Sequence, residues 1–193
     1  MMKNLFLNIL LIVVLFVSCK KEDNTPTPPT PPPPPTIAIG ESYQGGKIAY
    51  ILQAGDIGYD ANVQHGLIAA PSVQGIVAWG CNGLLISGAD GTAIGTGAQN
   101  TLDIMYGCNA PSTAARYCWD LVLGGYSDWY LPSKNELNQL YINKDLIGGF
   151  ENAVYWSSTE FGDSAAWWQV FGGGTQVTQD KDSQYNVRAV RSF

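Results

Sequence analysis

The sequence predicts one α+β domain with two helices and a mostly antiparallel sheet, and three observations support this class. A capping box of Ser133 and Glu136 starts a helix directly after a short apolar strand. A second helical pattern ends at a pair of glycines, Gly124 and Gly125. Strand-like segments follow late in the chain, two of them joined by a run of glycines. With 46% hydrophobic residues, the chain has enough apolar side chains for one core.

Residues 1–18 have the pattern of a lipoprotein signal peptide. The apolar run over residues 5–17 is shorter than the about 20 residues that a membrane-spanning helix needs. The segment Leu15–Cys19 resembles a bacterial lipobox, in which the cysteine becomes the lipidated first residue, so we expect Cys19 to be the lipid anchor. Ordinary secretion, with an unmodified thiol, is the alternative. The charges of Lys20–Asp23 resemble a tag for the outer face of the outer membrane, which predicts a surface-exposed, lipid-anchored protein.

Residues 19–36 are expected to be the lipidated cysteine and a disordered proline-rich linker. Eight of the twelve residues from Thr25 to Thr36 are prolines. Because proline has no backbone N–H to donate, this stretch favours an extended polyproline spacer of roughly 40 Å, at about 3.1 Å per residue. A docking motif for a proline-binding partner is the less favoured alternative beside a membrane anchor. The folded domain is then expected to span residues 37–193.

The first half of this domain is predicted to hold two short strands and one long loop. Residues 47–52 and 65–70 are apolar runs bounded by turn residues, as expected of buried strands. Residues 80–101 contain six glycines and many small polar residues, which predicts a long irregular surface loop. Because long loops in compact domains are commonly functional, this loop, with the loops near Trp167 and Gly172, is the expected contact surface.

The first helix is expected to run from Pro111 or Ser112 to Leu123. Its apolar side chains recur at i, i+1, i+4, i+7 and i+8 and therefore share one face: Ala114, Ala115, Cys118, Leu121 and Val122. After the glycine pair, residues 129–131 are expected to form a short buried strand. The second helix then starts at Ser133, and its apolar face carries Leu137, Leu140 and Tyr141.

The last third of the chain is expected to supply most of the sheet. Strands are predicted near residues 155–158, 165–171 and 175–179, with Gly172–Gly174 as a hairpin loop, and a final strand over residues 186–193. Trp167 and Trp168 are adjacent in one strand and must point to opposite faces, so at least one is expected to be exposed. Both are candidate ligand-binding residues, because an indole offers a flat face and a hydrogen-bonding tip.

Four segments together resemble one bacterial domain family. They are Gly45–Tyr50, Gly124–Tyr141, Tyr155–Glu160 and Val187–Phe193. In this order, over about residues 43–193, they resemble the Lcl C-terminal domain family, named for the terminal domain of a collagen-like bacterial surface adhesin. The resemblance implies a C-type-lectin-like fold on a secreted or surface-attached protein. It implies no shared catalytic residue and no shared ligand, but the named member is an oligomeric adhesin, so a homo-oligomer is an expectation to test.

Three cysteines lie outside the N-terminus, Cys81, Cys108 and Cys118, so at most one intramolecular disulfide and one free thiol can form. Secretion permits a disulfide. We favour Cys81 with Cys108, a pairing that would staple the long loop to the entry of the first helix. Cys118 is then expected to be buried as a small apolar residue.

The domain is acidic and lacks a recognisable catalytic set. Residues 37–193 carry seven basic and fourteen acidic side chains, a net charge of −7, which argues against nucleic acid and strongly sulfated polyanions as partners. His65 is the single histidine, so zinc sites and histidine-based triads lack parts. Asp180–Gln184 lacks the glycine and glutamate of a calcium loop, and the calcium tripeptides of sugar-binding C-type lectins are absent. We expect no catalytic residue, no metal and no cofactor.

Two arginines near the C-terminus, Arg188 and Arg191, are expected to form ion pairs with acids such as Glu160 or Asp128 and so to order the last strand. The sequence therefore favours a non-enzymatic surface lipoprotein with adhesin-like binding of an extracellular glycan or protein. Two alternatives stay open: a structural or assembly component of the cell envelope and, less favoured, an enzyme whose site assembles only in the folded chain.

Overall fold

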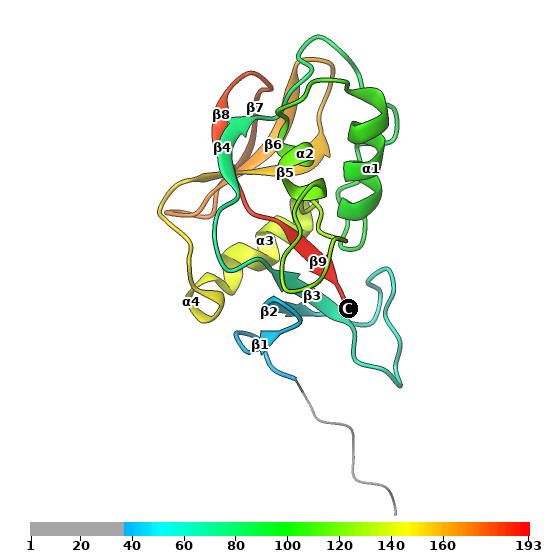
Figure 1. Cartoon of the computed structure of the whole chain (residues 1–193), viewed down its shortest axis with the longest axis vertical. Coiled ribbons are helices and arrows are strands. Elements are labelled where there is room, and N and C mark those ends of the chain that lie inside the picture. Colours follow the sequence, from blue (N-terminus) through cyan, green and yellow to red (C-terminus); the bar gives the residue numbers. More distant parts are fainter. Residues whose placement is uncertain (1–36) are drawn as a thin grey trace, which may run out of the picture. The chain divides into compact units, whose positions relative to one another are not determined.

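Two β-sheets organise residues 37–193, the part of the chain that this computed structural model describes (Figure 1). The signal peptide expected over residues 1–18, and Cys19 with the linker over residues 19–36, lie outside the described residues. The α+β class is confirmed, because helices pack on sheets whose strands are mostly antiparallel. None of the described helices is long and apolar enough to cross a membrane.

The strands divide between a four-stranded and a five-stranded sheet. The first has the order β1-β2-β3-β9 and is antiparallel; its strands are β1 (Ser42–Tyr43), β2 (Gly46–Ile51), β3 (Gly66–Ala69) and β9 (Val190–Ser192). The second has the order β4-β8-β5-β6-β7, with only β5 and β8 parallel; its strands are β4 (Gly75–Ala78), β5 (Val154–Glu160), β6 (Ala165–Val170), β7 (Gln176–Asp180) and β8 (Gln184–Val187). Five of the six strands predicted before residue 180 are confirmed, whereas β1 and β4 were not predicted. The strand predicted over residues 129–131 is wrong, because only an isolated bridge joins Tyr130 to Val190 there.

The single final strand expected over residues 186–193 is wrong. The chain leaves the five-stranded sheet after β8 and joins the four-stranded sheet as β9, a path drawn in red in Figure 1. Arg188 lies at this crossing, is fully buried, and donates hydrogen bonds to the carbonyl groups of Ala70, Gly148 and Gly149. Its guanidinium therefore holds the crossing between three backbone segments instead of pairing with a carboxylate.

The helices differ most from expectation in the middle of the chain. They are α1 (Gly97–Gly107), α2 (Ala114–Trp119), α3 (Lys134–Ile142) and α4 (Lys144–Ile147). The predicted loop over residues 80–101 therefore ends in α1. The face of α1 that is buried consists of Gly97, Asn100, Thr101 and Ile104, and it is too small and polar to show as apolar periodicity.

The helix predicted from residue 111 or 112 to residue 123 is shorter than expected. It starts after Thr113, whose side chain accepts a hydrogen bond from the N–H of Arg116, and it ends at Trp119. Gly124 and Gly125, with φ of 63° and 85°, form the turn of a small bridge between Leu123 and Tyr126 instead of ending the helix. The sequence pattern places Val122 on the apolar face of this helix, but Val122 is 71% exposed because the helix ends three residues before it.

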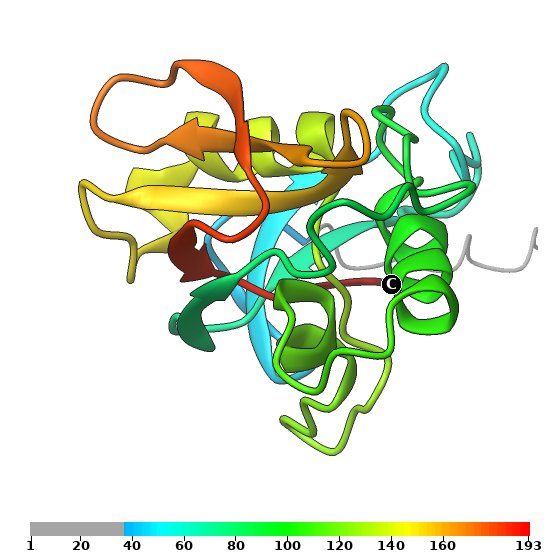
Figure 2. The ribbon, with the colours of Figure 1, turned by 90° about the horizontal axis from the view of Figure 1, so that it is seen from above.

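Two hydrophobic cores lie on the two faces of β5. Trp156 packs into one core with residues of α1 and α2, and its neighbour Tyr155 packs into the other with Leu137 and Leu140 of α3. Figure 2 shows β5 in yellow between these helices. The capping box of Ser133 and Glu136 that starts α3 is confirmed. The fold thus holds the loop that precedes α1 against β5, a strand buried on both faces.

Candidate functional site

The β4–α1 loop, residues 79–96, has no helix or strand of its own and lies at the surface beside α1. A loop of this length carries many backbone N–H and C=O groups that need hydrogen-bond partners. Side chains from distant segments supply them, and most of those side chains are buried. The loop therefore has a fixed conformation.

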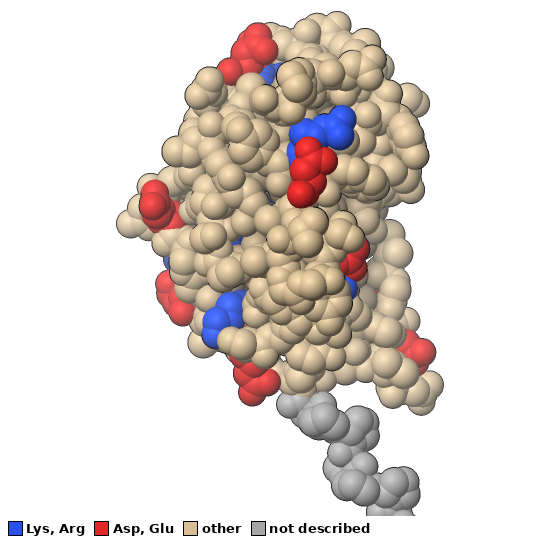
Figure 3. All heavy atoms as spheres, viewed as in Figure 1, with Lys and Arg blue, Asp and Glu red and all other residues tan. Residues whose placement is uncertain are grey.

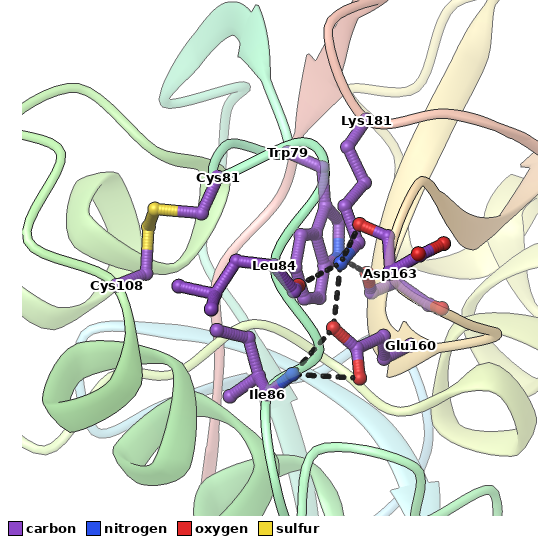
Figure 4. Close-up of polar contacts among 9 residues, drawn as sticks. Trp79, Cys81, Leu84, Ile86, Cys108, Glu160, Asp163 and Lys181 are labelled. Atoms are coloured by element: carbon purple, nitrogen blue, oxygen red, sulfur yellow. Dashed lines mark hydrogen bonds and ion pairs between the residues drawn. A yellow bond between two sulfur atoms is a disulfide. The ribbon is translucent and has the colours of Figure 1, made fainter.

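A buried ion pair holds the first half of the loop (Figure 4). Lys181 Nζ lies 2.6 Å from Glu160 Oε1, and the two side chains are 0% and 2% exposed. The ammonium also donates to the carbonyl oxygens of Leu84, at 2.8 Å, and Asp163, at 2.9 Å. Both carboxylate oxygens of Glu160 accept from the N–H of Ile86, at 2.9 and 3.0 Å. Every donor of the ammonium is thus used, which is the condition under which a buried ion pair is tolerated.

The second half of the loop is held by three further buried side chains. Thr159 donates to the carbonyl of Gly91 at 2.7 Å, and Asn100 of α1 donates to the same oxygen. Glu136 Oε1 accepts from the N–H of Gly95 at 2.8 Å while its other oxygen completes the capping box of α3. Burial raises the pKa of Glu136 to about 7. The start of α3 and the end of the loop therefore share one carboxyl group.

A disulfide closes the loop at its N-terminal end. Cys81 and Cys108 are bonded, with their Cα atoms 5.9 Å apart, and this is the pairing favoured from the sequence. Cys81 has a φ of 51°, an uncommon left-handed conformation that persists only where its surroundings fix it. Cys118 is the buried free cysteine, and burial raises the pKa of its thiol.

The loop presents apolar side chains to solvent. Leu84 is 47% exposed and Leu85 65%, although the residues on either side of this pair are held by hydrogen bonds to Asp163 and Glu160. Phe161, which follows Glu160 directly, is also 65% exposed. We call Leu84, Leu85 and Phe161 the loop surface. Since large apolar side chains held outward by a rigid backbone lose little freedom on binding, this surface is suited to contact a partner.

The structure separates Trp167 from Trp168. Trp167 packs edge-on against Phe161, 5.8 Å between ring centroids, and Lys134 Nζ lies 3.5 Å from the centre of its ring. Trp168 stacks on Tyr185 at 5.3 Å on the opposite face of β6. Each indole already has a partner within the domain, so the two tryptophans do not form one binding surface.

Several charged side chains of residues 37–193 are buried or paired with one another. Lys181, Arg188 and Arg191 are buried, which leaves four of the seven basic residues of the domain nearer the surface. Arg191 pairs with Asp128 at 2.7 Å as expected, and Asn82 donates to both Asp180 and Asp182. Figure 3 shows the charges scattered over one face. Residues 37–193 hold no group of three or more histidine, cysteine or acidic residues suited to a metal ion.

Comparisons with known proteins agree with this architecture. The model of the family described as Lcl C-terminal domain matches residues 79–191, from the start of the β4–α1 loop into β9. A crystal structure of a fimbrial protein from Bacteroides ovatus ATCC 8483 has a similar fold, with a TM-score of 0.50 and 16% sequence identity. The match covers 75% of this chain and 43% of that protein. No curated protein matches this sequence.

Proposed function

This chain belongs to the Lcl C-terminal domain family, and from that membership we propose that it is a non-enzymatic surface protein whose domain binds an extracellular glycan or protein. The family and the fold fit a cell-surface, adhesin-like role. We further infer from the family a relation to C-type-lectin-like folds. The fimbrial protein of similar fold supports an extracellular setting.

The observation that carries this proposal is the rigid loop surface. An ion pair, a disulfide and a set of buried polar side chains fix the β4–α1 loop, and its residues Leu84 and Leu85 nevertheless face solvent. Core formation does not explain such an arrangement, because exposed apolar area adds nothing to folding. Binding explains it, since a preorganised surface avoids the entropy cost of ordering a loop.

The binding test compares Leu85→Ser and Phe161→Ser with Ile142→Ser. The last variant is a matched control, because it also replaces an exposed apolar side chain by serine: Ile142, at the end of α3, is 59% exposed. Cells displaying the full chain are assayed for adhesion to surfaces coated with extracellular glycoproteins and matrix proteins. We expect both loop-surface variants to reduce adhesion severalfold while Ile142→Ser leaves it unchanged. Adhesion that is equal in all three variants would remove the loop surface from the proposal.

The anchoring part of the proposal places lipid on Cys19 and the domain outside the outer membrane. Incorporation of a labelled fatty acid that is lost in Cys19→Ala, together with release of the domain from intact cells by added protease, would support it. Unlabelled protein that is secreted free into the medium would contradict it, and would favour ordinary secretion.

A second candidate is a structural or assembly component of the cell envelope, which the similarity to a fimbrial protein favours. In that case the chain is expected to form a defined homo-oligomer and to bind neither glycan nor foreign protein. Light scattering on the purified full chain, compared with the adhesion assay, separates the two candidates. An enzyme is the least supported alternative, and it would need a catalytic group that these comparisons do not indicate.

A further inference from the structure

A pocket of about 410 Å³ lies where the start of α1, the end of α2 and residues 127–130 meet. Its volume falls within the range of about 300–1,000 Å³ that is typical of small-ligand pockets. None of the three residues of the loop surface lines it. The pocket is therefore separate from the loop surface, and the binding proposed for that surface does not involve it.

Much of the pocket lining is apolar. Leu102 of α1 and the buried Trp129 contribute to it, and Trp119, the last residue of α2, is 44% exposed. Within residues 37–193, no other ring or cation is paired with the indole of Trp119, whereas Lys134 covers that of Trp167. Trp119 thus offers a flat apolar face that is free to stack on a ligand.

A carboxylate of fixed position stands at the edge of this apolar lining. Asp128 accepts two hydrogen bonds from Arg191, each of 2.7 Å, and its side chain is still 57% exposed. Arg191 is itself fixed, since it lies 3.9 Å from the ring centre of Tyr126 and also donates to Gln44. A carboxylate has about four lone-pair sites, so Asp128 can accept further hydrogen bonds from a ligand without releasing Arg191.

Two more polar side chains line the same pocket. Gln99 of α1 is exposed and donates from Nε2 to Asp103 at 2.9 Å, which leaves its amide oxygen as an acceptor. Ser127 is exposed and its hydroxyl can both donate and accept. The pocket therefore combines an apolar aromatic face with several acceptors, and the guanidinium of Arg191, which binds Asp128, is already engaged.

This combination selects among ligand classes. A polyanion would find no cation among the lining residues, and Arg191 beside them is already paired with Asp128. A cationic ligand would find Asp128 already neutralised by Arg191. An apolar peptide side chain would fill the lining but take water from the carboxylate without replacing its hydrogen bonds, which is costly. A neutral pyranose has an apolar face for Trp119 and hydroxyl groups that donate to Asp128 and Gln99.

We propose that this pocket binds one neutral pyranose residue of an extracellular glycan, with Trp119 as the stacking platform and Asp128 and Gln99 as hydroxyl acceptors. The proposal rests on the proposed function as a surface binding module and names the ligand class and a second site for it. It requires no calcium ion, because all three groups contact the sugar directly.

The test is a panel of neutral oligosaccharides and their sulfated counterparts, applied to the full chain in detergent with and without a chelator. Trp119→Ala and Gln99→Ala alter the pocket; Ile142→Ser and Leu146→Ser, at exposed positions outside both the pocket and the loop surface, are the controls. Circular dichroism checks that each variant is folded. We expect a neutral member to bind equally with the chelator, about tenfold or more weakly in Trp119→Ala, and unchanged in both controls.

Three results would overturn the inference. They are neutral binding that Trp119→Ala and Gln99→Ala leave unaltered, a preference for sulfated members that weakens steeply with salt, and no saccharide binding at all. In the last case the adhesion assay separates the two proposals. If Leu85→Ser still reduces adhesion, the proposed function stands and only the pyranose site is discarded. If Leu85→Ser leaves adhesion unchanged and no saccharide binds, both the proposed function and the pyranose site are discarded.

Discussion

Replacing Lys181 by methionine tests whether the buried ion pair fixes the β4–α1 loop. The substitution removes an ammonium that binds Glu160, Leu84 and Asp163 and keeps most of the volume of the side chain. Glu160 then stays 2% exposed with only the N–H of Ile86 as a donor. Removing one partner of a buried pair costs about 3–5 kcal/mol, so we expect the free energy of unfolding to fall by roughly 4 kcal/mol.

The measurement is denaturant unfolding of the disulfide-bonded protein, followed by tryptophan fluorescence. Glu160→Met and the double variant complete a thermodynamic cycle. Because the double variant leaves no unpaired charge, we expect it to be at least about 2 kcal/mol more stable than the sum of the single effects predicts. As a control, Lys144→Met removes a 4.0 Å pair with Asp145, whose side chain is 94% exposed, and should change stability by less than about 0.5 kcal/mol.

The reasoning is refuted if Lys181→Met costs less than about 1 kcal/mol, or if the two single effects are additive. Protection of backbone amides from hydrogen exchange provides a second measurement. The amide of Ile86, bound to Glu160, should lose protection in Lys181→Met, while amides of β2 should change no more than global stability requires.

Three further predictions concern other parts of the site. The double variant Cys81→Ser/Cys108→Ser, which opens a loop with a sequence separation of 27, should lower the free energy of unfolding by about 3.5 kcal/mol. Gly97→Ala should destabilise the protein by about 1–3 kcal/mol, although alanine normally favours a helix, because its Cβ would lie 2.7 Å from the N–H nitrogen of Ser133. Burial raises the pKa of Glu136 from 4.5 to about 7, so the folded state keeps a proton that the unfolded state releases between these values, and stability should fall by roughly 3 kcal/mol as pH rises through this window.

Each of these has a direct check. Thermal and denaturant unfolding compare the cysteine variant with wild type before and after reduction; a difference that survives reduction would place the effect elsewhere. A Gly97→Ala protein as stable as wild type would contradict this prediction, because it would show that the backbone near Ser133 moves to make room for the Cβ. The pH dependence is read against Glu136→Gln, and equal pH profiles for the two proteins would contradict the assigned titration.

The parts of the fold that follow from local sequence were predicted well. The capping box of Ser133 and Glu136 and the hairpin at Gly172–Gly174 depend on residues a few positions apart, so the sequence displays them. Helix α1 was missed because three of the four residues on its buried face are glycine, asparagine and threonine, so the helix shows no apolar periodicity. Gly124 and Gly125 end a helix or turn a hairpin equally well, and only the pairing of Leu123 with Tyr126 decides which.

The sequence by itself determined the family, the α+β class and the acidic, histidine-poor composition, and it favoured the disulfide that the structure contains. The tertiary structure alone decided which charges are buried. Lys181 stands between two aspartates and looks like a solvated residue, yet it reaches Glu160 across 21 positions. The pocket at Trp119 likewise joins α1, α2 and residues 127–130. Partners so far apart meet only when the sheets close, because local propensity carries no information about which polar groups burial will pair.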